Sequence, residues 1–150
     1  MALQETIDQE IKAAMLAKDN AKLRGLRAIK SALLVAKTEK GAAETITEET
    51  EIKVLQRLVK QRRESADIYK QQNREDLYQI EAEEIEVIES FLPKQMDRAE
   101  VEQVISQLIK DTGASSVKDM GKVMGAANQQ LAGKADGKTI AEIVKNLLSA

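Results

Sequence analysis

The amino-acid sequence predicts an all-α protein, with an N-terminal hairpin-type domain of about four helices followed by a small C-terminal bundle of three helices. Apolar side chains recur at every third or fourth position along most of the chain, as on one face of a helix. Good helix formers dominate the composition, and the chain contains a single proline. Aromatic residues make up only 2%, so the core must be aliphatic, and no sheet is expected.

Four amphipathic helices are expected in the first part of the chain. Asp19 is placed to cap the second of them, and Gly41 is placed to end it. Pro93 cannot continue a helix and disfavours helical geometry at the residue before it, so we place the boundary between domains 1–93 and 94–150 there. The four helices run from Leu3 to near Lys18, from about Asn20 to Lys40, from about Glu48 to Gln72, and from about Glu75 to Leu92.

Three shorter helices are expected after the proline, each opened by a capping box in which two side chains three residues apart bond each other's backbone amides. Gly113 and Gly133 stand where the first two of these helices should end. Asp136 is an alternative start for the last helix. The boxes are Asp97 with Glu100, Ser116 with Asp119, and Thr139 with Glu142, and the middle helix should bury Val117, Met120, Met124, Ala127 and Leu131.

Glycines gather in the segment from Gly121 to Lys138. Gly121 and Gly125 lie four residues apart inside a predicted helix, where each costs about 1 kcal/mol relative to alanine. The close approach of a neighbouring helix or of a ligand should offset this cost, and we favour the helix because small-residue stripes are usually packing devices. The candidate close-approach glycines are Gly121, Gly125, Gly133 and Gly137.

The net charge of −2 argues against nucleic-acid binding through overall attraction. Residues 94–150 nevertheless hold eight basic against seven acidic side chains, whereas residues 1–93 hold fifteen against eighteen. The C-terminal part is therefore the less repellent half for a phosphate backbone.

Four lysines of the glycine-rich segment are candidate phosphate ligands: Lys118, Lys122, Lys134 and Lys138. The last two flank a helix start, where unpaired amides and the helix dipole attract anions. The alternative is ordinary helix caps with lysines added for solubility, and an Asp136 cap would compete with the anion.

A second basic face occupies residues 22–40. It could contact phosphates, or it could pair with the acidic helix at residues 75–92. Pairing is the favoured interpretation, although exposed ion pairs contribute only about 0–1 kcal/mol each.

Catalysis finds little support in this sequence. The chain has no histidine and no cysteine, which removes the commonest acid–base, thiol and metal-binding groups. Ser115 and Ser116 lack the glycine-serine-rich signature and the partner lysine of amidases, and Ser116 is better explained as a helix cap. We expect no catalytic residue, no metal and no cofactor.

No apolar segment approaches the roughly 20 residues that cross a bilayer, so no membrane contact is expected. The absence of cysteine suits a reducing compartment, and the sequence predicts a cytoplasmic protein.

The motifs Gly121-Lys-Val-Met-Gly125 and Gly133-Lys-Ala-Asp-Gly-Lys138, with Phe91-Leu-Pro-Lys-Gln95 upstream, resemble the YqeY family. That resemblance covers the whole chain. The family is related to the C-terminal tail domain of the B subunit of tRNA-dependent amidotransferases, which convert mischarged Glu-tRNA or Asp-tRNA to the amide form. The likeness to this tail covers about the last third of the chain and part of the helical region before it. Since the tail engages tRNA and the catalytic portion lies elsewhere, the resemblance implies contact with structured RNA.

Three functions follow from the sequence and the resemblance. The first is a non-catalytic protein that binds tRNA, or a tRNA-bearing enzyme, through the four lysines. The second is a protein-interaction module that docks a partner through its long charged helices and glycine stripe. The third, implied by the resemblance alone, is an accessory role in glutamine-dependent amide transfer, a carbon–nitrogen ligase activity, with separate catalytic subunits.

Overall fold

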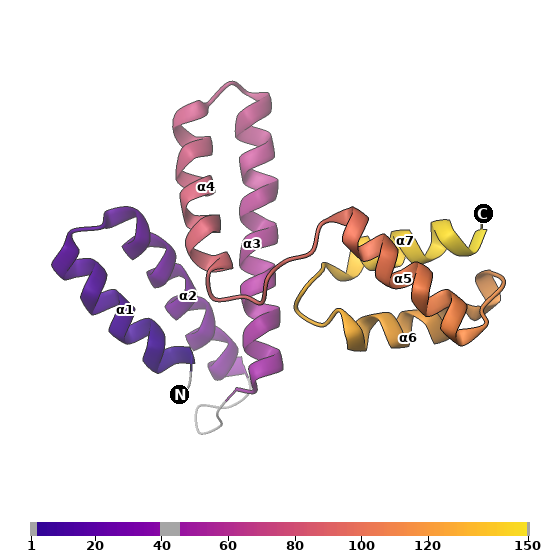
Figure 1. The fold of residues 1–150 in the computed structure, drawn as a ribbon. Helices are drawn as coiled ribbons and strands as arrows, with labels where there is room; N and C mark the ends of the chain where they lie inside the picture. Colours follow the sequence, from indigo (N-terminus) through magenta and orange to yellow (C-terminus); the bar gives the residue numbers. More distant parts are fainter. Residues whose placement is uncertain (1–2, 40–45, 150) are drawn as a thin grey trace. The chain divides into compact units, whose positions relative to one another are not determined.

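The computed structural model describes residues 3–39 and 46–149. Within these ranges it contains seven α-helices, one 3-10 helix and no strand, so the prediction of an all-α fold is confirmed (Figure 1). Backbone contacts group the chain into two compact units, Met1–Leu92 and Pro93–Ala150. The division into domains 1–93 and 94–150 stays a prediction.

The first unit consists of two helical hairpins, in which α1 pairs with α2 and α3 pairs with α4 (Figure 1). The observed ends lie within three residues of the predicted ones where the chain is described. The expected end at Lys40 and the stop at Gly41 lie outside the described residues. The helices are α1 (Leu3–Ala17), α2 (Asn20–Glu39), α3 (Glu48–Gln71) and α4 (Glu75–Glu89).

The cap at the start of α2 forms as expected, because the backbone N–H of Lys22 donates to Asp19 Oδ1 at 3.1 Å. The last helix of the unit ends earlier than predicted. The N–H groups of Phe91 and Leu92 donate to carbonyls three residues back, at 3.1 and 3.0 Å, so the chain tightens into turns before it reaches Pro93.

The core of this unit is aliphatic and joins all four helices. Gly25 of α2 is also buried, and the helix packs there directly against Val87 of α4. The core cluster consists of Ile7, Ala14, Leu26, Ile29, Leu33, Leu55, Val59 and Ile88.

Carboxylates pair with three of the cations on the basic face of α2. Arg24 lies 2.8 Å from Glu83 of α4, as the interpretation by charge pairing requires. The ammonium groups of Lys22 and Lys30 instead meet Glu10 and Asp8 of α1, at 2.9 and 2.8 Å. These partners in α1 were not predicted, because only the acidic helix at residues 75–92 was considered as a source of carboxylates. The pairing favours a structural role for this face.

The second unit is a small bundle around a second aliphatic core. Its helices are α5 (Arg98–Thr112), the 3-10 helix η1 (Val117–Asp119), α6 (Met120–Gln130) and α7 (Gly137–Ser149). The core cluster consists of Val101, Ile105, Val123, Ala127, Leu131, Ile140, Ile143, Val144 and Leu148.

One predicted core residue of this unit is exposed. Val117 is 47% exposed, whereas Val123 is fully buried in its place. The prediction was wrong because residues 117–119 form a 3-10 helix. A 3-10 helix has fewer residues per turn than an α-helix, so the residues that face the core differ from those expected for a continuous α-helix.

The caps of this unit agree with the sequence in part. The box of Ser116 and Asp119 forms, and Gly113 ends α5 at a φ of 71°. The prediction of a capping box of Thr139 with Glu142 was wrong, because α7 begins at Gly137, just after Asp136. Gly133 has a φ of 75°, but it stands two residues beyond Leu131, which caps α6.

Candidate nucleic-acid interface

All four candidate lysines belong to the second unit and are exposed. Lys118 lies in η1, and Lys122 lies in the first turn of α6. Lys134 lies in the loop between α6 and α7, and Lys138 lies in the first turn of α7. They therefore form two pairs, each beside the start of a helix.

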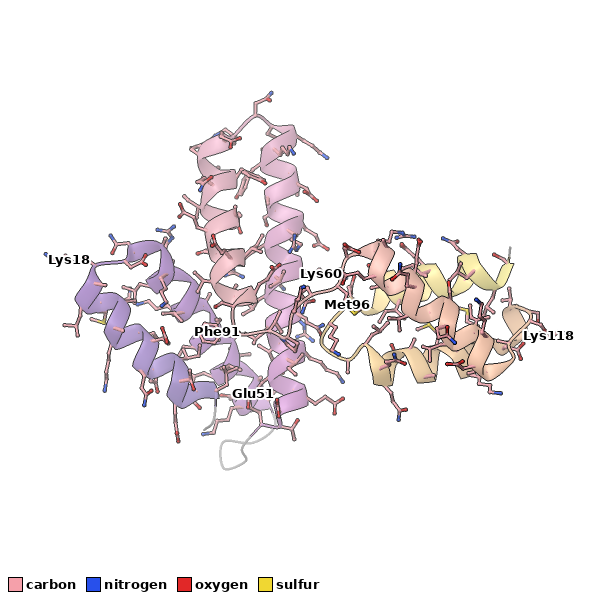
Figure 2. All side chains as sticks on the ribbon, in the orientation of Figure 1. Lys18, Glu51, Lys60, Phe91, Met96 and Lys118 are labelled. Carbon is pink, nitrogen blue, oxygen red and sulfur yellow. The ribbon has the colours of Figure 1, made fainter. Side chains whose placement is uncertain are left out.

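The two pairs lie at opposite ends of α6. This helix has 11 residues, so its axis is about 16 Å long. Figure 2 shows Lys118 at one end of the unit and Met96 at the other, and the Met96 N–H donates to the carbonyl of Lys134 at 2.9 Å. A single phosphate cannot reach both pairs. A common surface, as sequence analysis envisaged, needs an extended polyanion.

In the described part of the unit, no carboxylate forms an ion pair with a candidate lysine. The ion pairs found in the described part of this unit join Arg98 to Glu102 at 3.5 Å and to Glu142 at 3.7 Å. Neither involves a candidate lysine. The ammonium group of Lys122 donates to the backbone carbonyl of Thr112 at 3.2 Å, and this bond leaves its charge in place.

Carboxylates lie at both helix starts beside the candidate lysines, including the start of α7 that was considered for an anion. Asp119 Oδ2 accepts the N–H groups of Ser115 at 2.9 Å and of Ser116 at 3.3 Å. These bonds, aided by the charge of Lys122, lower the pKa of Asp119 below its usual range. Asp136 Oδ1 accepts the N–H of Lys138 at a long 3.5 Å. The ammonium groups, not the backbone amides, are therefore the groups available to a phosphate.

Among the described residues, no neighbouring helix packs against Gly121 or Gly125 of α6. A Cβ atom added at Gly121, Gly125 or Gly137 would meet nothing within 4 Å. The expectation that a helix of this chain offsets the cost of Gly121 and Gly125 was therefore wrong, because both lie on the exposed face of α6. Gly133 is buried, and its carbonyl accepts the side-chain N–H of Gln95 at 2.7 Å.

Two features escaped sequence analysis. The first is Gly25, which makes the close helix contact that we expected of the glycines of α6. The sequence indicates this contact only by placing a glycine within the buried face of a predicted helix. The second feature is a groove of about 280 Å³ between α5 and the end of α6. In the sequence, the groove is indicated only by the four-residue spacing of Gln103, Gln107 and Asp111, and such spacing is also common on ordinary exposed helix faces.

Ser116 and the acidic side chains, the groups that a catalytic or metal centre would use, have the following places in the described residues. Ser116 acts as a helix cap, since its Oγ accepts the N–H of Lys118 at 3.3 Å. Across residues 3–39 and 46–149, no group of three or more acidic side chains could hold a metal ion. In the same ranges, every helix is too short or too polar to cross a membrane.

Comparison with models of known protein families identifies the family of this chain. The family model described as Yqey-like protein matches residues 4–148, which is nearly the whole chain. The chain belongs to the YqeY family. The relation to the tail domain of the amidotransferase B subunit, inferred from the motifs, is consistent with this membership.

Two curated relatives share the name "altered inheritance of mitochondria protein 41, mitochondrial". The YqeY chain is 32% identical to the one from Clavispora lusitaniae over 135 residues, which cover 87% of this chain and 77% of the relative. It is 30% identical to the one from Vanderwaltozyma polyspora over 122 residues, which cover 76% of this chain and 64% of the relative.

These names contradict the cytoplasmic location expected from the sequence, because both relatives are named as mitochondrial proteins. The expectation rested on the absence of cysteine together with the absence of an apolar segment that could cross a membrane or direct secretion. The absence of cysteine does not distinguish the cytoplasm from other compartments that keep thiols reduced.

Proposed function

We propose that this YqeY protein is a non-catalytic binder of structured RNA, with tRNA, free or on a tRNA-bearing enzyme, as its ligand. Lys118, Lys122, Lys134 and Lys138 make the contacts. The observation that carries the proposal is the contrast between the two units. Lys22, Arg24 and Lys30 of α2 are held by carboxylates at 2.8–2.9 Å, whereas the four lysines face solvent without such partners.

The separation of the lysine pairs supports a ligand with a continuous phosphate backbone. About 12 Å of helix axis separates Lys122 from the end of α6 at Gln130, so each pair meets a different part of the polyanion. Residues 94–150 contain no Phe, Tyr or Trp, and stacking of unpaired bases on aromatic rings is therefore not available. Recognition rests on the shape of a folded RNA and on its phosphates.

The open glycines of α6 fit the same role. Gly121 and Gly125 leave the exposed face of α6 without side chains on either side of Lys122 in the sequence. An RNA backbone can approach the helix closely there, as a ligand that offsets the conformational cost of two glycines. Gly137 is open in the same way and directly precedes Lys138, whereas Gly133, which directly precedes Lys134, is buried.

If the protein takes part in glutamine-dependent amide transfer, its contribution in this proposal is the contact with tRNA. The family relation supports that link, and separate subunits supply the chemistry. The groups that the described residues offer are ammonium groups and helix caps, which bind and position a polyanion.

The test is a fluorescence-anisotropy titration of bulk tRNA at two salt concentrations. Wild type is compared with the triple variant Lys122→Ala, Lys134→Ala, Lys138→Ala. The matched control removes three exposed lysines of the first unit, Lys12, Lys60 and Lys70, and so makes the same change in net charge.

The proposal expects salt-dependent binding that the triple variant loses and the control keeps. If wild type fails to bind tRNA even at low salt, the RNA proposal is wrong. Equal losses in the two triple variants would also contradict it, because binding would then follow net charge alone.

A further inference from the structure

We infer that the groove between α5 and α6 contacts the ribose 2′-hydroxyl edge of the bound RNA and makes this protein prefer RNA to DNA. The inference rests on the proposed function. The groove belongs wholly to the second unit, and its lining residues are Gln103, Val104, Gln107, Leu108, Asp111 and Gln130.

Polar side chains stand above an apolar floor in this groove. Gln103, Gln107 and Asp111 are exposed and spaced by four residues, so they form one row along α5. Val104 and Leu108 are half-buried and pack against the core of the unit. The floor is thus fixed by the core, and the carboxamides reach outward from it.

The groove lies between the two pairs of lysines. The Lys122 ammonium group reaches the carbonyl of Thr112, the neighbour of Asp111, and so marks one end of the groove. Gln130 is the last residue of α6, and Lys134 follows it by four residues near the other end. An RNA backbone held at both ends therefore passes over the carboxamides.

The side chains of the groove match a 2′-hydroxyl group. A carboxamide both donates and accepts hydrogen bonds, as a 2′-hydroxyl does. The Gln107 side chain donates to Asp111 Oδ1 at 2.8 Å, which fixes that carboxamide and leaves its oxygen able to accept. The described contacts give the carboxamides of Gln103 and Gln130 no partner within the chain, so both can turn toward a ligand.

Other parts of a nucleic acid fit the groove less well. The Asp111 carboxylate repels a phosphate that enters the groove, so the phosphates stay with the lysines at its ends. An extruded base would find no aromatic ring in residues 94–150. The minor groove of an RNA helix instead displays its 2′-hydroxyls on a wide and shallow surface, which a row of carboxamides can follow.

The test compares an RNA hairpin with a DNA hairpin of the same sequence, each titrated with wild type and with the double variant Gln103→Ala, Gln130→Ala. Alanine is a good helix former at these exposed positions, so the fold should be retained. The control is Gln129→Ala, an exposed glutamine of α6 that does not line the groove.

Wild type should bind the RNA hairpin more tightly than the DNA hairpin. Each removed glutamine should weaken RNA binding about two- to tenfold and leave DNA binding and the salt dependence unchanged. The lysine triple variant should instead weaken binding of both hairpins.

An unchanged ratio of RNA to DNA affinity in the double variant overturns the inference and leaves the proposed function standing. Equal affinity of wild type for the two hairpins overturns it as well. Failure of wild type to bind either hairpin overturns both the inference and the proposed function.

Discussion

Gly25 of α2 lies so close to Val87 of α4 that a Cβ atom at position 25 would be 2.7 Å from the Val87 Cβ. Real Cβ atoms do not come this near to another side chain, so the absence of a side chain at Gly25 allows the two helices to pack. This contact sets how closely α2 can approach α4 where the two hairpins pack.

Gly25→Ala should therefore destabilise the protein by about 1–3 kcal/mol, because the added methyl group overpacks the helix crossing. Urea denaturation followed by circular dichroism measures the effect. A variant as stable as wild type would show that α2 and α4 can separate without cost, and would contradict the close packing.

Gly121→Ala provides the opposite case. The position lies in α6 with nothing within 4 Å of the added atom, so alanine should stabilise the protein by up to about 1 kcal/mol through helix propensity. The same substitution should weaken tRNA binding if the RNA backbone approaches α6 closely. Gain of stability without any loss of binding would remove Gly121 from the proposed interface.

The ion pair of Arg62 with Glu84 should contribute more than the exposed pairs. The two side chains are only 18% and 15% exposed and lie 3.3 Å apart. Arg62→Ala should cost about 1–2 kcal/mol, between the values for exposed and for buried pairs. Arg98→Ala is the comparison, since its pair with Glu102 is half exposed and its loss should cost less than about 1 kcal/mol. Similar losses in both variants would contradict this ranking.

Asp119 should make stability depend on pH. Its pKa is lower in the folded protein than the ordinary value of 3.8, mainly because the backbone N–H groups of Ser115 and Ser116 donate to its carboxylate. The stabilisation is therefore present above pH 3.8 and is lost as the pH falls through the folded pKa. Wild type should exceed Asp119→Asn in stability near neutral pH, and the difference should shrink in acid. A difference that stays constant in urea titrations from pH 6 to pH 2.5 would argue against this account.

The helices of this protein follow from the sequence because their causes are local. The spacing of Leu26, Ile29 and Leu33 gives the buried face of α2, and the Asp19 cap gives its start. The prediction was ambiguous where two local signals were equally strong. Asp136 and Thr139 could each cap the last helix, and the structure starts it after Asp136.

The candidate site was less predictable because its features depend on contacts between helices. Exposure of the lysines follows from their positions on helix surfaces, but the separation of Lys122 from Lys134 follows from the length and direction of α6. Likewise, the sequence shows that Gly25 and Gly121 are both helical glycines. Only the packing shows that a helix covers the first and that none covers the second.

The central claim is that two separate lysine pairs bind one RNA molecule, and the salt dependence of tRNA binding tests this claim most directly. Each phosphate contact contributes about 0.7–0.9 to the slope of the logarithm of affinity against the logarithm of salt concentration. Two double variants are compared with wild type: one carries Lys118→Ala and Lys122→Ala, and the other carries Lys134→Ala and Lys138→Ala. Each should lower the magnitude of that slope by about 1.5, and the variant without all four lysines should lower it by about twice as much. A wild-type affinity that does not change with salt, or pair variants that keep the wild-type slope, would contradict it.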